Sequence, residues 1–239
     1  MAKLKIVVFV TTVGEPSTFE VIRSFVDNTP VPFKLVAWYD ACGRGVDRHF
    51  YDKLLLQCDD VILSTQQKGL AAVMGFAALY LDYDYLIWTM ADTPVYPDYF
   101  ARISEALNEV PTAGAVGEAW RPMVEKYAVS DFDRGIDGVV CLKREAVEAA
   151  GSFSPSFNGK GPFHQELYRR MTRCGFDFVA IDGLCANGAL THEGRDADKN
   201  WHGLLHEDNL AWREINKADY KYKWWTKEMG KKELASAKA

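Results

Sequence analysis

The chain has 239 residues, of which 48% are hydrophobic and 26% are charged. This length and composition suit one soluble α/β domain with a full hydrophobic core, and exclude a fibrous or low-complexity chain. The formal net charge of −5 argues against a general polyanion-binding surface.

Cysteine usage and hydropathy narrow the cellular setting. The five cysteines are scattered without a CxxC pair, so neither a disulfide framework nor a zinc knuckle is indicated, and reduced thiols in the cytoplasm are the simplest account. The longest apolar run, residues 69–81, is shorter than the ~20 residues of a membrane span. The one basic concentration, residues 217–232, suits a solvated helix end, with a patch for phosphate or nucleic acid as the alternative.

Apolar segments alternate with amphipathic ones along the first half of the chain. The branched run at residues 4–10 predicts a strand buried on both faces of a parallel sheet. Ser17 and Glu20 have the spacing of a capping box, which predicts a helix after this strand. The next elements continue the alternation, with strands at 33–39, 59–63 and 85–90 and an Ala-rich helix at 69–80. This order predicts an α/β fold with a doubly wound, mostly parallel sheet flanked by helices.

The second half of the chain has a different sequence pattern but shows no linker or internal repeat. Its expected elements are strands at 113–117, 138–142 and 176–181 and helices at 143–150, 163–174 and about 207–225. A glycine follows each of the first two helices and predicts where they end. We therefore expect a single domain over residues 1–230, followed by a disordered tail at 231–239.

Asp92 is the first candidate site residue. The apolar strand at 85–90 stops just before this carboxylate, and a Thr-Pro turn follows, with Pro97 placed to open a helix. Open α/β sheets bind ligands at the carboxyl ends of their strands, where a carboxylate commonly holds a divalent ion against phosphate oxygens. The alternative is that Asp92 only shapes the turn.

Several common nucleotide-binding and hydrolytic motifs are absent. The loop after the first strand, Thr11 to Ser17, contains one glycine and therefore lacks the Gly-x-Gly-x-x-Gly fingerprint of dinucleotide-binding domains. No P-loop, Gly-x-Ser-x-Gly or His-Glu-x-x-His occurs.

A spaced set of features instead resembles the GT-A fold nucleotide-sugar glycosyltransferases, most closely the inverting family 2 group. The resemblance covers roughly residues 4–225. It implies a nucleotide-sugar half at about 1–110 and an acceptor half at about 111–230. By resemblance, the residues expected to contact the nucleotide sugar are Thr11 and Glu15 in the first loop, Asp40 after the second strand, Gly69 and Asp92.

The metal motif of this family is incomplete in the chain. Met90 stands in place of the first Asp of the Asp-x-Asp motif, which leaves Asp92 as the implied metal ligand. His192 lies where many members supply a second ligand, although a lone loop histidine is more often a surface residue. The resemblance implies Mn²⁺ or Mg²⁺, and an imidazole ligand suits Mn²⁺ better.

The segment 161–175 resembles the helix that carries the general base in the family. Phe163-His164 replaces the family's Glu-Asp pair, so His164 or Glu166 is left to deprotonate the acceptor. We favour Glu166, because the family uses a carboxylate. Residues two apart do not share a helix face, so only one of the two is expected to point into the site. The alternative is that Glu166 is a helix-start charge and His164 packs aside.

Two further segments extend the resemblance. Residues 216–224 look like the aromatic and lysine-bearing ending of many members, and the polar loop at 120–134 is expected to face the acceptor.

The resemblance therefore implies a metal-dependent glycosyltransferase that moves a sugar from a nucleoside-diphosphate sugar, with UDP favoured, to a hydroxyl acceptor with inversion. Its expected partners are the donor and a glycan or other hydroxyl acceptor. A non-catalytic nucleotide- or sugar-binding module is the main rival. Transfer to a modified nucleobase in DNA stays open, while a sugar-nucleotide pyrophosphorylase is disfavoured because its Gly-rich basic loop is missing.

Overall fold

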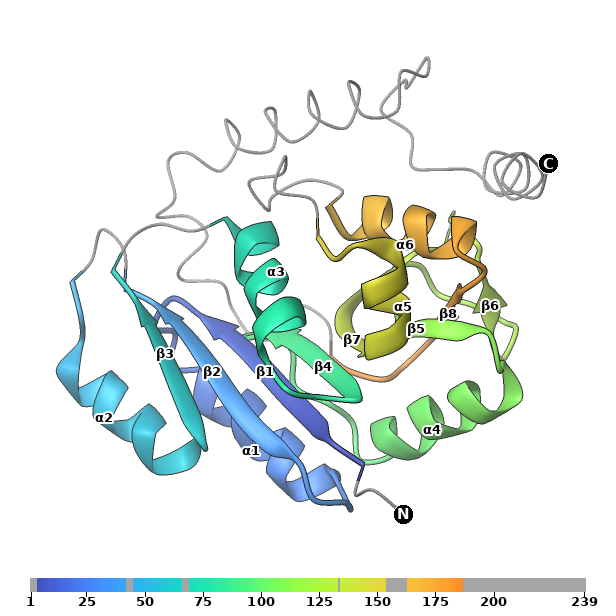
Figure 1. Cartoon of the computed structure of the whole chain (residues 1–239). Coiled ribbons are helices and arrows are strands. Elements are labelled where there is room, and N and C mark those ends of the chain that lie inside the picture. Colours follow the sequence, from blue (N-terminus) through green and yellow to red (C-terminus); the bar gives the residue numbers. More distant parts are fainter. Residues whose placement is uncertain (1–3, 42–44, 66–68, 133, 154–162, 187–239) are drawn as a thin grey trace.

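The computed structural model describes residues 4–41, 45–65, 69–132, 134–153 and 163–186 (Figure 1). In chain order these residues form β1 (Ile6–Thr12), α1 (Thr18–Asn28), β2 (Lys34–Asp40), α2 (Arg48–Gln57), β3 (Asp60–Ser64), α3 (Leu70–Tyr80), β4 (Tyr85–Met90), α4 (Tyr99–Glu109), β5 (Ala113–Ala119), β6 (Ala128–Val129), β7 (Ile136–Lys143), α5 (Arg144–Ala150), α6 (Phe163–Arg173) and β8 (Asp177–Ile181). His192, the expected helix at 207–225, the ending at 216–224 and the tail at 231–239 lie outside the described residues.

The described strands form one eight-stranded sheet in the order β3-β2-β1-β4-β7-β5-β8-β6. The first four are mutually parallel, and β5 and β8 are parallel to each other. Strand β7 runs antiparallel to both of its neighbours, β4 and β5, and β6 runs antiparallel to β8. The predicted α/β class with a mostly parallel sheet is confirmed. The sheet is nevertheless mixed, because the chain returns from β5 to β7 through a loop and β6 instead of a crossover helix.

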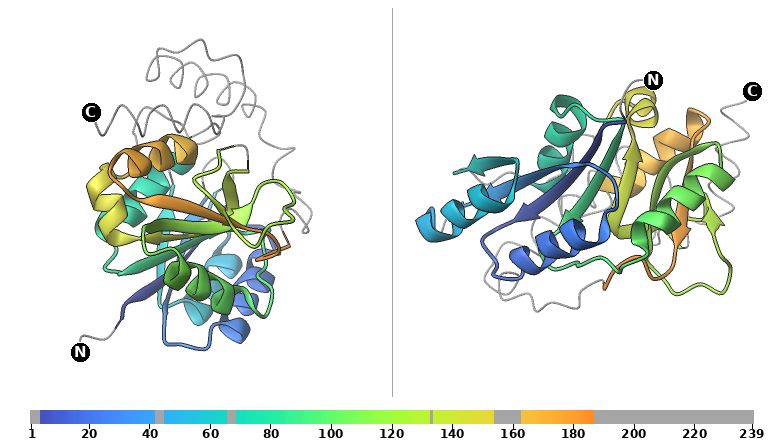
Figure 2. Two further views of the ribbon diagram at one scale, coloured as in Figure 1. Left: turned by 90° about the vertical axis from the view of Figure 1, so that its right-hand side faces the viewer. Right: turned by 90° about the horizontal axis from the view of Figure 1, so that it is seen from below.

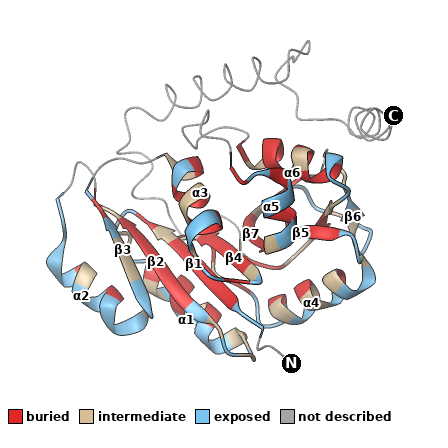
Figure 3. Cartoon of the chain, in the orientation of Figure 1, coloured by how far each residue is buried: buried red, intermediate tan, exposed pale blue. Residues whose placement is uncertain are grey.

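Helices cover both faces of the sheet, which gives three layers (Figures 1 and 2). One face packs against α3, α5 and α6 through Phe9, Trp88 and Phe178, among others. The opposite face packs against α1, α2 and α4, with Val8 and Ile87 in its core. Alternate residues of β1 therefore enter two different cores, which explains the unbroken apolar run in its sequence. Figure 3 shows the buried central strands between helices whose outer surfaces are exposed.

The start of α1 differs from the predicted capping box. Ser17 already has helical backbone angles, and its hydroxyl makes no capping hydrogen bond. The backbone N–H of Thr18 donates instead to the carbonyl oxygen of Glu15 at 3.0 Å. The helical backbone thus begins already at Ser17. The N–H groups of Phe19 and Glu20, which a capping side chain would bind, already donate to backbone carbonyls.

The helix α2 was not predicted from the sequence. Its buried residues are Phe50 and Leu54, while Leu56 is 86% exposed. The usable signal is Asp47, whose side chain caps the helix by accepting a hydrogen bond from the Phe50 N–H at 3.0 Å. Within the described ranges, no helix has the length and apolar character needed to cross a membrane.

Candidate functional site

The carboxyl ends of the parallel strands place the predicted nucleotide-contacting residues along one edge of the sheet. Register pairs Thr11 of β1 with Met90 of β4, and Asp40 at the end of β2 with Ser64 of β3. Asp92 follows β4 by two residues, and Gly69 precedes α3 just after β3. In sheets of this kind ligands bind outside this edge.

A hydrogen-bonded turn follows β1. The Glu15 carboxylate accepts hydrogen bonds from the Thr12 hydroxyl at 2.8 Å and from the Val13 N–H at 2.9 Å. Gly14 has a φ of +101°, a conformation that residues with side chains rarely adopt, so the turn favours glycine. Glu15 therefore fixes the shape of the loop that we predicted to contact the nucleotide sugar.

Two of the other predicted residues also have structural contacts. The Thr11 hydroxyl donates to the backbone oxygen of Thr89 at 3.4 Å, which ties the end of β1 to β4. The carbonyl of Gly69 accepts the N–H of Ala72 at 2.9 Å and starts the first turn of α3. The N–H groups of this first turn lie at the carboxyl edge, where the helix dipole favours negative charge.

Asp92 is buried, with 6% of its surface exposed. Its Oδ1 accepts a hydrogen bond from the Thr93 hydroxyl at 3.0 Å, and the Thr93 N–H donates to the Met90 carbonyl at 3.3 Å. The Thr89 hydroxyl in turn donates to the Thr93 carbonyl at 3.3 Å. Asp92 is thus held in a tight turn at the end of the strand.

The described residues contain no group of three or more His, Cys, Asp or Glu side chains that could hold a metal ion. A metal ion at Asp92 would therefore take its remaining ligands from a substrate, from water or from residues outside the described ranges. Mg²⁺-type sites with one or two carboxylates and substrate phosphates have this composition.

His164 lies at the start of α6, against the carboxyl half of β4. Its ring centroid is 6.4 Å from that of Trp88 and 6.3 Å from that of Tyr168. Within the described part of the chain its Nδ1 atom is buried and has no hydrogen-bond partner. Burial lowers the pKa of His164 below the usual 6.5, and the nearby Asp137 opposes this shift. The imidazole is therefore neutral near pH 7 and able to accept a proton.

Glu166 is engaged differently, as expected for a position two residues from His164. Only 4% of its surface is exposed, and Arg170 binds both carboxylate oxygens, with Nε–Oε1 at 2.7 Å and Nη2–Oε2 at 2.8 Å. The same guanidinium donates to the backbone oxygens of Ala150 and Ser152. The ion pair lies within α6 and holds the guanidinium, whose bonds to Ala150 and Ser152 link α6 to the end of α5.

Glu118 is a buried carboxylate at the same edge that we did not predict. It accepts hydrogen bonds from the backbone N–H groups of Gly183 at 2.8 Å and Cys185 at 3.2 Å, and also from that of Leu184. Burial raises the pKa of Glu118, and the three N–H groups oppose the shift. A lone charge near the end of the small-residue strand β5 was the signal for it in the sequence.

Neither a protein family nor a curated protein sequence matches the chain. Solved structures do match. A mannosyltransferase, PcManGT from Pyrobaculum calidifontis, in complex with GDP-Man and Mn²⁺, aligns with a TM-score of 0.67 at 17% identity, covering 98% of this chain and 68% of its own. Residues 1–349 of S. aureus TarS with UDP-GlcNAc align with a TM-score of 0.63 at 12% identity, covering 98% and 71%. GalNAc-T7 with UDP, GalNAc and Mn²⁺ aligns with a TM-score of 0.59 at 15% identity, covering 74% and 42%.

The chain has the GT-A fold. The resemblance drawn from the sequence is thereby confirmed at the level of the fold. Sequence identities this low do not assign functions to individual residues. The roles of Asp92, His164 and Glu166 therefore depend on the surroundings of each side chain in this structure.

Proposed function

We propose that the protein is a metal-dependent glycosyltransferase, which transfers a sugar from a nucleoside-diphosphate sugar to a hydroxyl acceptor. The observation that carries this proposal is the placement of Asp92, a buried carboxylate directly after β4 at the carboxyl edge of a GT-A sheet. Structural neighbours described in complex with GDP-Man and Mn²⁺ or with UDP, GalNAc and Mn²⁺ support the same chemistry.

Asp92 would hold a Mn²⁺ or Mg²⁺ ion. A carboxylate oxygen is a suitable ligand for either ion, and the donor diphosphate would supply most of the others. When bound, the ion neutralises charge on the departing nucleoside diphosphate. We further propose His192 as a second protein ligand, a role that favours Mn²⁺.

The rest of the carboxyl edge would bind the donor. Asp40 would accept hydrogen bonds from the ribose or the base, and the loop containing Thr11 and Glu15 would border the nucleotide. Gly69 would let the diphosphate approach the first turn of α3. We favour UDP as the nucleotide, although the neighbours divide between GDP-linked and UDP-linked ligands.

His164 is the better candidate for the general base, in place of the Glu166 favoured by resemblance. A base needs a lone pair to accept a proton, and the Nδ1 of the neutral His164 ring has no hydrogen-bond partner among the described residues. Both oxygens of Glu166 are already bound by Arg170, so we assign it the positioning of α6. Asp137 would stabilise the imidazolium formed when His164 takes the acceptor proton, with inversion at the sugar carbon.

A non-catalytic nucleotide-binding module is the second candidate. Two observations favour it, namely Met90 in place of a second carboxylate and Phe163-His164 in place of the Glu-Asp pair that carries the general base. Such a module would bind Mn²⁺ and UDP without releasing UDP from a UDP sugar. Nothing in the described residues favours a nucleobase acceptor in DNA.

The test compares Asp92→Asn with Asp98→Asn. The control makes the same chemical change at an exposed position six residues along, whose side chain makes no capping bond. We expect UDP or GDP release from a panel of nucleotide sugars with Mn²⁺ to fall at least about 100-fold in Asp92→Asn, because a bound metal contributes several kcal/mol to such a step. The control should retain wild-type release.

Full activity in Asp92→Asn would contradict the proposal. Binding of Mn²⁺ and UDP by the wild type, without release from any donor, would favour the binding module.

A further inference from the structure

The segment after β8 lies beside the loop that follows Asp92. The N–H of Tyr96 donates to the carbonyl of Leu184 at 3.0 Å, and the N–H of Ala186 donates to the carbonyl of Pro94 at 3.0 Å. Val95 and Cys185 form an antiparallel bridge between these bonds. Residues 182–186, here called the 182–186 turn, therefore act as a short strand partner for the segment 94–96.

Two charged side chains of opposite sign hold the 182–186 turn. The Arg102 guanidinium, from α4, donates to the backbone oxygens of Asp182 at 2.6 Å and Gly183 at 2.7 Å. The Glu118 carboxylate, from the end of β5, accepts the N–H groups of Gly183, Leu184 and Cys185. Both the carbonyls and the N–H groups of the turn are thereby bound by charged side chains from two different elements.

The end of β5 is shaped to bring Glu118 to the turn. The register between β5 and β7 shifts between Gly117 and Glu118, as a β-bulge does when it redirects a side chain. A Cβ at Gly117 would lie 2.8 Å from the carbonyl oxygen of Val139, so this bulge tolerates only glycine. Burying a carboxylate is unfavourable unless its acceptors are used, and here three converging N–H groups use them.

We propose that Glu118 is a positioning residue for the Asp92 site. It acts through the 182–186 turn, which fixes residues 94–96 and so sets where the preceding Asp92 carboxylate points. This inference rests on the proposed function, because it assigns Glu118 a part in binding metal and nucleotide. Arg102 shares the role from the carbonyl side of the turn.

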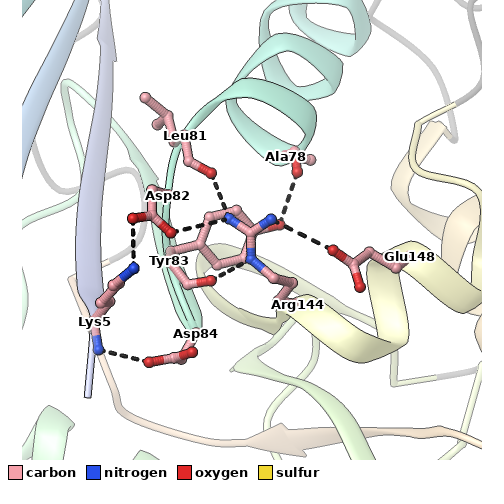
Figure 4. Close-up of polar contacts among 8 residues, drawn as sticks. All are labelled: Lys5, Ala78, Leu81, Asp82, Tyr83, Asp84, Arg144 and Glu148. Carbon is pink, nitrogen blue, oxygen red and sulfur yellow. Dashed lines mark hydrogen bonds and ion pairs between the residues drawn. The ribbon is translucent and has the colours of Figure 1, made fainter. Parts of the chain in front are cut away.

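A second arginine that binds two backbone carbonyls, Arg144, lies near the start of β4 and offers a matched control (Figure 4). The Arg144 guanidinium donates to the backbone oxygens of Leu81 at 2.6 Å and of Tyr83, and lies 4.3 Å from the centre of the Tyr83 ring. It also approaches Glu148 at 3.4 Å. Arg102 and Arg144 thus each bind a pair of backbone carbonyls, Arg102 in the 182–186 turn and Arg144 before β4 begins.

The experiment uses the full chain and three variants, namely Glu118→Gln, Arg102→Lys and the control Arg144→Lys. Affinity for UDP in the presence of Mn²⁺ is measured by titration calorimetry, and hydrogen exchange of the Tyr96 amide by NMR. We expect roughly ten-fold weaker affinity in the first two variants, at the low end of the about 10–100-fold cost of losing a supporting partner. Tyr96 should exchange faster in both, and neither quantity should change in Arg144→Lys.

Equal loss of affinity in all three variants would reduce Glu118 to a structural residue and overturn the inference. Unchanged affinity in Glu118→Gln and Arg102→Lys would overturn it as well. If Glu118→Gln does not fold, Arg102→Lys decides alone.

A wild type that binds neither UDP nor GDP with Mn²⁺ would instead contradict the proposed function. The exchange rate of Tyr96 would then still show whether Glu118 controls the segment after Asp92, because wild-type protection in the variants would exclude this.

Discussion

Replacing Glu166 with Gln separates the two candidate bases. Gln keeps the shape of the side chain but removes the charge that Arg170 binds at 2.7 Å. If Glu166 is structural, the variant should lose stability and keep most of its turnover once folded. If His164 is the base, His164→Gln should lose about 10²–10⁴ in turnover, with little change in stability.

The size of the stability loss follows from the burial of the pair. Removing one partner of a buried ion pair costs about 3–5 kcal/mol. The Arg170 side chain is 24% exposed, so water relieves part of its lost pairing. We therefore expect Glu166→Gln to lower the free energy of unfolding by about 2–3 kcal/mol, which corresponds to a melting temperature lower by about 4–12 °C.

A double-mutant cycle checks this reasoning. Arg170→Met leaves the Glu166 carboxylate buried without its partner, and should cost about 3–5 kcal/mol. The free energy of unfolding lost in the double variant, measured by urea unfolding, should be about 0.5–3 kcal/mol smaller than the sum of the losses in the two single variants. The reason is that each single variant already removes the same interaction. Additive losses would refute the ion-pair account. Loss of UDP release in folded Glu166→Gln, with release retained in His164→Gln, would return the base to Glu166.

Three further predictions test other parts of the account. Because burial lowers the pKa of His164 below 6.5, the unfolded chain binds more protons than the native one just below this pH. The free energy of unfolding should therefore fall as pH drops through this range, less so in His164→Gln, and the acid limb of the pH–rate profile should lie below 6.5. Gly114→Ala should destabilise the fold by about 1–3 kcal/mol in urea unfolding, because the new Cβ would meet the Ala146 Cβ at 2.5 Å. Asp47→Ala should cost about 1 kcal/mol in the same assay by uncapping α2.

Much of the fold followed from local pattern. The strand at 85–90 was predicted with its observed bounds, because an apolar run between polar residues leaves little choice. Gly151 and Gly175 have positive φ values and lie just beyond the ends of α5 and α6, as their sequence positions predicted. The direction of β7 could not be predicted, because side-chain alternation is the same in parallel and antiparallel strands.

The site was predicted only in part, for a related reason. Asp40 and Asp92 follow apolar strands, and the topology alone then brings them to one edge. The partners of Glu118 lie about 65 residues further along the chain, where no local pattern connects them. The ion pair of Glu166 was within reach, since Arg170 stands four residues later on the same helix.

A crystal structure with Mn²⁺ and UDP tests the central claim most directly. The anomalous signal of manganese locates the ion without reference to the protein chemistry around it. We predict one peak bridging a carboxylate oxygen of Asp92 and the UDP diphosphate, at about 2 Å from each, the distance typical of such ions. A manganese peak away from Asp92, or UDP bound at the carboxyl edge with no ion beside it, would contradict the account.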